Sequence, residues 1–370
     1  MAGYSYIELE KENKKPFVLI MAGGVGSRFW PASRENLPKQ FLDITGTGKS
    51  LIQSTFDRFA SFIPVENIYV ITHQDYAELT LNAIAGFKHK NLITEPSRNN
   101  TAASIALASF KLIQKDPDAI CVVAAADHII NDENEFQRVI REACNHADAN
   151  HSFVTLGIKP TRPDTGYGYI EYDTNDHADV RKVKSFREKP NATDALFYME
   201  TGNFVWNSGI FIWRLDIILE AYKIHATSIF DILNRGKEIY NTDAEIDFIQ
   251  LEYPKTQKIS VDYAILEKAH NVFTIPCDIG WSDLGTWNSL FEINEKDEAQ
   301  NAILSKPVYL EDTHHSLIIA EHSKLVVIKG LKGFIVVDTD DCLLIFPKAE
   351  EQSIKELKDK LKIEGLEQYL

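Results

Sequence analysis

The chain has 370 residues, 44% of them hydrophobic, so it can bury a core and hold one large domain with a small one beside it. Its formal net charge is -15, with a sequence pI near 5.2. Nucleic acids and anionic membranes select broad basic surfaces, and this charge argues against both as main partners.

The cysteines and the N-terminus indicate a cytoplasmic protein. Cys121, Cys144, Cys277 and Cys342 are scattered and form no C-x-x-C pair, which argues against a zinc site or a disulfide framework. The first fifteen residues are polar and lack the apolar stretch of a signal peptide, and no apolar run approaches the length of a membrane span. We therefore expect reduced thiols and no secretion.

Apolar runs alternate with helical patterns through most of the chain. The segment 101–112 is Ala-rich and favours a helix, and buried strands are predicted at 17–22, 68–72, 120–125 and 153–158. This alternation predicts an α/β fold with a Rossmann-like, mostly parallel sheet that carries helices on both faces. We assign residues 1–298 to this domain.

The pattern changes after about residue 300. Short apolar runs separated by polar turns predict strands at 307–310, 316–319, 325–328, 334–337 and 343–346. Ile354, Leu357 and Leu361 share one face of a closing amphipathic helix. Residues 299–370 are therefore expected to form a small β-rich domain.

A glycine-rich turn follows the first predicted strand. Gly23, Gly24, Gly26 and Ser27 begin the run GGVGSRFWPASR at 23–34. Glycines at the carboxyl end of a buried strand can adopt positive φ and let backbone N–H groups converge on phosphate oxygens. The turn is therefore predicted to bind the phosphates of a nucleotide triphosphate.

Basic residues accompany this turn. Arg28, Arg34 and Lys39 would add full charges to the phosphate site, although basic residues after a turn can also be solvated surface charges. Pro31 and Pro38 stiffen the segment, and a stiff segment is more typical of a binding loop than of one that only carries solvated charges. The phosphate interpretation is favoured.

Two other phosphate motifs do not fit. A dinucleotide fingerprint beginning at Gly24 would need a third glycine where Phe29 stands, and a P-loop ending at Ser50 would need its first glycine where Asp43 stands. The Gly-Lys-Ser sequence at 48–50 is predicted to be a turn before a helix that begins near Ser50.

The run at 23–34 and the PKQF sequence at 38–41 resemble the signature of the sugar-nucleotide pyrophosphorylases, and their FWP and PKQF variants are similar to the mannose-1-phosphate guanylyltransferases in that family. Further motifs follow in the family's order: EPSRNNTA at 95–102, ADH at 126–128, TGYGYI at 165–170, FREKP at 186–190, WNSG at 206–209, SVDYA at 260–264 and WSDLG at 281–285. Ala103 and Ala125 stand where the family commonly has proline, which could shift the guanine pocket. The resemblance implies a nucleotidyltransferase fold and a short left-handed β-helix-like tail. A bifunctional enzyme with a cupin-type isomerase domain is not expected.

Carboxylates suited to magnesium come at the same edge of the predicted sheet. Asp127 follows the strand at 120–125, where it could hold Mg²⁺ together with substrate phosphates, or could cap a helix or a turn. The resemblance implies Asp283 as the second ligand, and a turn residue is again the alternative. His128 is expected to be a hydrogen-bonding neighbour of the metal site.

Sugar recognition is predicted in the middle of the chain. Gly168 begins a strand at which a ligand could approach the backbone, or marks a β-bulge. Glu188 could accept hydrogen bonds from sugar hydroxyls and Lys189 could bind the sugar phosphate, or the two could form a surface charge pair. Asn207 needs polar partners beside an apolar run, and Asp262 could bind a hydroxyl or cap a helix.

The guanine base is the least constrained part of the predicted site. Glu95, Asn99 and Asn100 are candidate readers of the guanine edge, and Thr101 belongs to the same nucleotide-binding segment. Polar loop residues are often simply solvated. The base specificity therefore depends more on the resemblance than on these residues.

The resemblance implies that mannose 1-phosphate attacks the α-phosphorus of GTP in line and displaces pyrophosphate. We assign Arg28 to the departing β- and γ-phosphates, Lys39 to the α-phosphate, and Mg²⁺ on Asp127 and Asp283 to bridging the substrates. The alternatives are a related enzyme for another nucleotide or sugar phosphate, and a non-catalytic binder of sugar nucleotides. The β-rich tail is a candidate surface for a homodimer.

Overall fold

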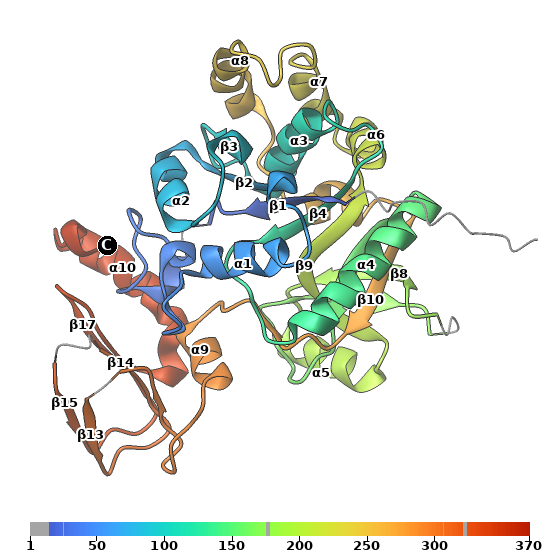
Figure 1. The fold of residues 1–370 in the computed structure, drawn as a ribbon. Helices are drawn as coiled ribbons and strands as arrows, with labels where there is room; N and C mark the ends of the chain where they lie inside the picture. The colour runs from blue at the N-terminus through green and yellow to red at the C-terminus, as the bar shows by residue number, and fades with distance from the viewer. Residues whose placement is uncertain (1–14, 25, 175–177, 306, 321–323) are drawn as a thin grey trace, which may run out of the picture.

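The computed structural model describes residues 15–24, 26–174, 178–305, 307–320 and 324–370. Val25 of the glycine run and the N-terminal segment, in which we expected no signal peptide, lie outside these ranges. The large domain is built on a nine-stranded sheet in the order β3-β2-β1-β4-β9-β6-β10-β8-β7 (Figure 1). Its strands are β1 (Phe17–Met21), β2 (Ile68–His73), β3 (Leu92–Glu95), β4 (Ile120–Ala125), β6 (Phe153–Ile158), β7 (Gly168–Tyr172), β8 (Arg181–Glu188), β9 (Phe204–Arg214) and β10 (Val272–Cys277).

The sheet has a parallel half and a largely antiparallel half. Strands β3, β2, β1 and β4 run parallel, as do β6 and β10, whereas β9 is antiparallel to β4, β6 and β7, and β8 is antiparallel to β7 and β10. The predicted α/β fold class is confirmed, and the observed sheet is mixed. Alternating apolar runs separated by helices identified the parallel half, because each crossover there needs a helix.

Helices cover both faces of the sheet, as predicted (Figure 1). Alternate residues of β1 point to opposite sides: Phe17 and Leu19 pack with α3, α6 and α7, whereas Val18 and Ile20 pack with α1 and α4. Among the described residues, no helix is both long and apolar enough to cross a membrane. The helices are α1 (Leu51–Ala60), α2 (Ala77–Ala83), α3 (Asn100–Leu112), α4 (Glu133–Asn150), α5 (Ala192–Thr201), α6 (Leu215–His225), α7 (Thr227–Asn234), α8 (Glu245–Glu252), α9 (Trp287–Ile293) and α10 (Ile354–Ile363).

The C-terminal segment forms its own short sheets. Strands β12, β14 and β16 run parallel and β17 closes that sheet in the antiparallel direction, while β13 and β15 form a second parallel pair. From β12 to β16 successive strands therefore alternate between two sheets, which is the arrangement of a short β-helix. The remaining strands of the chain are β5 (Ile129–Ile130), β11 (Trp281–Ser282), β12 (Ala302–Ile303), β13 (Val308–Glu311), β14 (Leu317–Ile319), β15 (Val326–Lys329), β16 (Phe334–Asp338) and β17 (Leu343–Pro347).

The C-terminal domain packs directly on the glycine-rich segment. Trp30 Nε1 donates to the backbone oxygen of Tyr369 at 2.6 Å, and the Arg34 guanidinium forms an ion pair with both carboxylate oxygens of Asp341. Phe29 and Trp30 also share a buried apolar cluster with Ile354 at the start of α10. Arg34, which the sequence offered as a phosphate-binding cation, is instead used to hold the two domains together.

Candidate active site

The glycine-rich turn at the end of β1 is held against the short 3₁₀ helix η2 (Lys39–Phe41). Gln40 Nε2 donates to the backbone oxygens of Ala22 and Gly24, both at 2.9 Å. Gly26 has φ 66°, and a Cβ there would lie 2.5 Å from the Cβ of Lys39. Only glycine fits this position, because it must accept left-handed backbone geometry and close contact together.

Lys39 is almost fully buried, with 4% of its surface exposed. Its Nζ lies 2.8 Å from Asp127 Oδ2 and donates to the backbone oxygens of Asp283 at 3.1 Å and Leu284 at 2.8 Å. Three acceptors match the three protons of an ammonium group. Lys39 therefore joins the two loops that carry the predicted metal carboxylates, and can reach a phosphate only by giving up one of these acceptors.

A cavity of about 390 Å³ opens beside this turn. It contains the main cationic and acidic residues predicted for catalysis, whereas Gly23 and Gly24 do not line it. The lining residues are Gly26, Ser27, Arg28, Phe29, Lys39, Asp127, His128, Asp283, Gly285 and Lys355.

Protein donors fix both carboxylates of this cavity. Asp283 Oδ1 accepts hydrogen bonds from the Tyr167 hydroxyl at 2.8 Å and from the Gly285 N–H at 2.9 Å. Burial alone would raise the pKa of Asp127, but the Lys39 ammonium and His128 outweigh it and hold that pKa below its ordinary value. Asp127 is therefore presented to the cavity as an anion, and the two hydrogen bonds fix the position of Asp283.

His128 is a neighbour of these carboxylates. Burial lowers its pKa, which favours the neutral ring, and its Nδ1 accepts a hydrogen bond from Trp281 Nε1 at 3.2 Å. The rings of His128 and Trp281 meet edge to face with centroids 5.4 Å apart. His128 therefore makes a hydrogen bond beside the carboxylates, and its expected place next to a metal ion, as a neighbour and not a ligand, stays a prediction.

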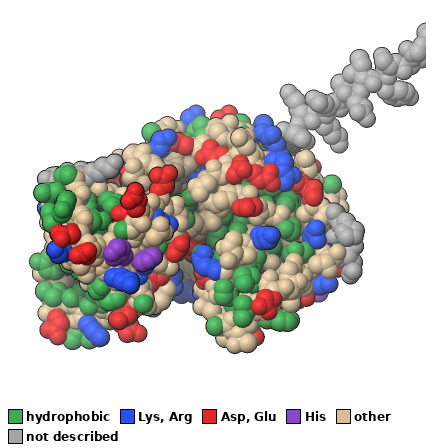
Figure 2. Space-filling view, turned by 90° about the horizontal axis from the view of Figure 1, so that it is seen from below, with side chains coloured by type: hydrophobic (Ala, Val, Ile, Leu, Met, Phe, Trp, Pro, Cys, Tyr) green, Lys and Arg blue, Asp and Glu red, His purple; other side chains and the backbone are tan. Residues whose placement is uncertain are grey.

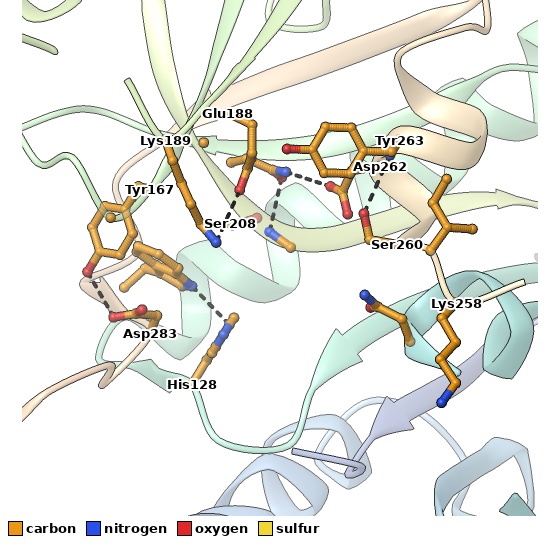
Figure 3. A pocket seen from close by; sticks show the side chains of 17 residues that line it. His128, Tyr167, Glu188, Lys189, Ser208, Lys258, Ser260, Asp262, Tyr263 and Asp283 are labelled. Atoms are coloured by element: carbon orange, nitrogen blue, oxygen red, sulfur yellow. Dashed lines mark hydrogen bonds and ion pairs between the residues drawn. The ribbon is translucent and has the colours of Figure 1, made fainter. Parts of the chain in front are cut away.

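A second cavity of about 560 Å³ lies along β7, β8 and β9 (Figure 3). The structure brings all five residues predicted for sugar binding to its walls. These are Gly168, Glu188, Lys189, Asn207 and Asp262.

The polar groups of this larger cavity are linked to one another. Asn207 Nδ2 donates to Asp262 Oδ1 at 2.8 Å, while Asn207 Oδ1 accepts from the Gly209 N–H at 3.1 Å. Burial raises the pKa of Asp262, and burial together with the Asp262 charge raises the pKa of Glu188. Two partly desolvated carboxylates gain from polar hydrogens brought by a ligand, and a sugar ring carries several hydroxyls.

Gly168 is positioned for close approach by a side chain. It pairs with Glu188 across β7 and β8, and a Cβ there would lie 2.4 Å from Glu188 Oε2. The register shift in this strand pair falls between Glu171 and Tyr172, so Gly168 is not at the bulge. Lys189 Nζ lies 4.0 Å from Glu188 Oε1, and Figure 3 shows both side chains directed into the cavity.

The residues predicted to read guanine separate into two groups. Glu95 is buried, with Oε2 accepting from Ser104 and Tyr253, and its Oε1 lies 3.2 Å from the Cβ position of Gly23. Asn100 lines the larger cavity. Glu95 therefore lies behind the glycine turn, whereas Asn100 faces the open space.

Asn99 and Thr101 support the loop. Asn99 is fully buried, and its Nδ2 donates to the backbone oxygens of Tyr253 and Thr256 and to the Thr256 hydroxyl. Thr101 Oγ1 accepts from the Val261 N–H at 2.9 Å, which links the nucleotide segment to the sugar segment. Both side chains therefore support this loop, neither lines the two cavities described here, and their predicted contact with the nucleotide stays a prediction.

The two cavities meet at shared residues, since His128 and Asp283 line both of them. A cationic turn that suits phosphate thus adjoins a polar site that suits a polyol. A fixed carboxylate stands at the junction.

Comparison with known proteins agrees with this geometry. A family model described as nucleotidyl transferase matches residues 17–300, and one described as a MannoseP isomerase/GMP-like beta-helix domain matches residues 308–361. The chain belongs to the nucleotidyl transferase family. It is 36% identical over 363 residues to mannose-1-phosphate guanylyltransferase of Salmonella montevideo, covering 95% of this chain and 75% of the relative.

Two further relatives support this assignment. The nucleotidyl transferase is 36% identical over 358 residues to mannose-1-phosphate guanylyltransferase RfbM of Salmonella typhimurium, with 95% of this chain and 73% of the relative covered. A crystal structure from Thermus thermophilus, described as a mannose-1-phosphate geranyltransferase, superimposes with a TM-score of 0.85 at 28% identity and covers 94% of this chain and 99% of that one. The resemblance found in the sequence motifs is thereby confirmed along nearly the whole chain.

The carboxylates of this nucleotidyl transferase fit a magnesium ion. Among the described residues, no third histidine, cysteine or carboxylate joins Asp127 and Asp283. Magnesium does not require one, because it is usually held by one or two carboxylates together with waters and substrate phosphates. The donor set suits magnesium better than zinc, which prefers nitrogen and sulfur ligands.

Several cavity residues escaped the sequence prediction. Tyr167 stood inside a recognised motif, but its hydrogen bond to Asp283 spans 116 positions and could not be read from local pattern. Lys258, Ser260 and Tyr263 line the larger cavity from the segment before and within the SVDYA motif. Lys355 reaches the smaller cavity from α10, and its only sequence signal was that of an amphipathic helix.

Proposed function

We propose that this nucleotidyl transferase transfers GMP from GTP to α-D-mannose 1-phosphate, forming GDP-mannose and pyrophosphate. The observation that carries the proposal is the junction of the two cavities at His128 and Asp283. The printed names of the relatives supply mannose and guanine. A turn that suits phosphate next to a site that suits a polyol supports transfer of a nucleotidyl group to a sugar phosphate.

The proposed reaction needs alignment and charge neutralisation. The attacking phosphate oxygen is already an anion, so no general base has to activate it. Arg28 is exposed on the wall of the smaller cavity, where it would bind the β- and γ-phosphates. Lys39 would exchange one of its acceptors for the α-phosphate as charge develops there.

The sugar end would be held by the linked polar groups of the larger cavity. Glu188, Asn207 and Asp262 offer acceptors for ring hydroxyls, and Lys189 offers a cation for the sugar phosphate. This arrangement would place the phosphate toward Asp283. Asp127 and Asp283 would hold magnesium, which when bound would neutralise phosphate charge and orient the two substrates.

The base would lie near the glycine turn and β3. Glu95 Oε1 lies against the backbone of Gly23 and the residue is 5% exposed, so the carboxylate would accept from the ring N–H and the amino group of guanine only after the glycine turn had moved away from it. Burial raises the pKa of Glu95 despite its hydrogen bonds from Tyr253 and Ser104, so it would gain from additional donors. A base that lacks these donors would bind less well.

The test is pyrophosphate release with Mg²⁺ across a panel of nucleotide triphosphates and sugar 1-phosphates. We expect GTP with mannose 1-phosphate to give the highest kcat/KM. Preference for UTP or dTTP would overturn the guanylyl assignment, and preference for glucose 1-phosphate would overturn the mannosyl one.

Single substitutions test the assigned residues. Arg28→Ala and Asp127→Ala should each lower kcat by about a hundredfold or more, as expected for loss of a preorganised charge in the transition state. Arg141→Ala removes an exposed arginine of α4 and is the control. A kcat within about threefold of wild type for either site variant would contradict its role.

We also propose a cytoplasmic homodimer. All four cysteines are free thiols, which supports a reducing compartment. Tyr309 on β13 and Val327 on β15 stand side by side with 58% and 63% of their surface exposed. Burial of such a strand pair against a second copy would remove apolar surface from water.

Light scattering would test the dimer. Val327→Asp should shift the protein to a monomer, whereas Lys329→Asp on the same strand, at a residue already charged, should shift it less. A wild-type monomer at micromolar concentration would contradict the proposal. On the face seen in Figure 2, basic side chains lie scattered among acidic ones, in keeping with a partner other than nucleic acid.

A further inference from the structure

The smaller cavity has fewer available cations than its sequence suggested. Lys39 is committed to three protein acceptors, and Arg34 pairs with Asp341 in the C-terminal domain. Of the cations predicted in the glycine-rich segment, Arg28 is the one that lines the cavity with an exposed side chain. A departing pyrophosphate carries several negative charges, so further positive charge is needed beside it.

Lys355 supplies a second exposed cation to this cavity. It is exposed, it lines the same cavity as Gly26, Ser27 and Arg28, and it comes from α10 of the C-terminal domain. Its neighbour Ile354 is fully buried against Phe29 and the surrounding apolar cluster, which fixes the first turn of the helix. The position of Lys355 is therefore set by the core.

A second contact brings the same region to the phosphate turn. The Glu351 carboxylate accepts from the Asn288 N–H at 2.8 Å and lies close enough to Arg28 for the guanidinium to lower its pKa, although burial raises that pKa overall. The segment that precedes α10 thus adjoins the Arg28 side chain. Arg28 and Lys355 lie on two domains that meet at one cavity.

We propose that Lys355 binds the β- and γ-phosphates of the nucleotide and the pyrophosphate that leaves, so that the C-terminal domain completes the phosphate site. The inference rests on the proposed nucleotidyl transfer for its kinetic test. It does not depend on which base or sugar is used. The reaction gains no new step, because Lys355 contributes charge and hydrogen bonds to an anion that forms and departs in any case.

The experiment compares Lys355→Gln with Lys360→Gln, which removes the same charge from an exposed residue at the other end of α10. Forward and reverse kinetics give KM values for the nucleotide, the sugar phosphate and pyrophosphate, and calorimetry gives the affinity for magnesium pyrophosphate alone. We expect Lys355→Gln to raise KM for pyrophosphate and the Kd for magnesium pyrophosphate by about tenfold, the effect of one charge-assisted hydrogen bond. KM for the sugar phosphate should stay within about twofold, and Lys355→Arg should recover most of the affinity.

The outcomes separate this inference from the proposed function. If wild-type protein binds magnesium pyrophosphate but transfers no guanylyl group, the proposed substrate pair is wrong, and the calorimetric comparison still decides the role of Lys355. If Lys355→Gln and Lys360→Gln bind pyrophosphate equally well, Lys355 is a surface charge and the inference is overturned. Equal melting temperatures for the two variants would show that loss of affinity is not loss of fold.

Discussion

The close approach of Gly168 and Glu188 allows a prediction with a defined geometry. A Cβ at position 168 would lie 2.4 Å from Glu188 Oε2, whereas real contacts of a Cβ essentially never fall under 3.0 Å. In Gly168→Ala the carboxylate would have to withdraw, which is cheap for stability because it is the end of a flexible side chain. The withdrawal would weaken a charge-assisted hydrogen bond to a sugar hydroxyl, worth about 1.5–3 kcal/mol. Because the Glu188 side chain is 30% exposed, we expect the lower end, about a tenfold fall in kcat/KM for the sugar phosphate.

A double-mutant cycle would show whether Glu188 carries this effect. We expect Gly168→Ala to lower kcat/KM in the wild-type background but to add less than about twofold in Glu188→Ala, where the space is open. KM for GTP and the melting temperature should change little in either background. An equal tenfold loss in both backgrounds would refute the reasoning, because the methyl group would then act on something other than Glu188.

Three further predictions follow from the same structure. Gly26→Ala should destabilise the protein by about 2 kcal/mol or more, because it combines left-handed backbone strain with a steric clash. Gly24→Ala is the control and should not destabilise it, because no atom lies within 4 Å of its Cβ position. Thermal unfolding of the two variants measures the difference. Asn99→Ala should lower the free energy of unfolding by about 2–3 kcal/mol, because the amide group donates only to protein oxygens. KM for GTP should stay within about threefold. A large change in KM with unchanged stability would instead support a base-reading role. Burial alone would raise the pKa of Asp216, but Arg214 holds it below the ordinary value, so this stabilisation is present above about pH 4 and is lost as the pH falls further. Unfolding of Arg214→Gln should accordingly depend less steeply on pH below that value.

The sequence predicted the fold well where periodicity and composition are local. The apolar run at 17–22 became β1, Ser50 caps α1 through the Gln53 N–H as a plain helix start, and the five predicted C-terminal strands are all present. The antiparallel half was not foreseen. Strands β7, β8 and β9 pair across loops of irregular length. The alternation of apolar and polar residues in a short strand does not show whether its partner runs parallel or antiparallel.

The candidate site was predictable as a set of residues but not as a set of contacts. The motifs identified Asp127, Asp283 and the residues predicted to bind the sugar, and these residues line two adjoining cavities. Nothing in the sequence showed that Lys39 would be saturated by protein oxygens, or that Asn99 would be fully buried. Such partners lie 150 or more positions away in several cases, and side-chain hydrogen bonding at that separation depends on the completed fold.

The burial of Lys39 gives it a different role from that of the exposed cations of the site. An ammonium group with three fixed acceptors stabilises the loops that carry Asp127 and the 283–284 turn before any substrate arrives. Preorganisation of this kind lowers the reorganisation needed in the transition state. It also leaves the outer phosphates to cations that stay exposed, one on the glycine-rich segment and one on α10. In the proposed site, positive charge for the outer phosphates would come in part from the C-terminal domain, which would give a physical reason for that domain to pack on the glycine-rich segment.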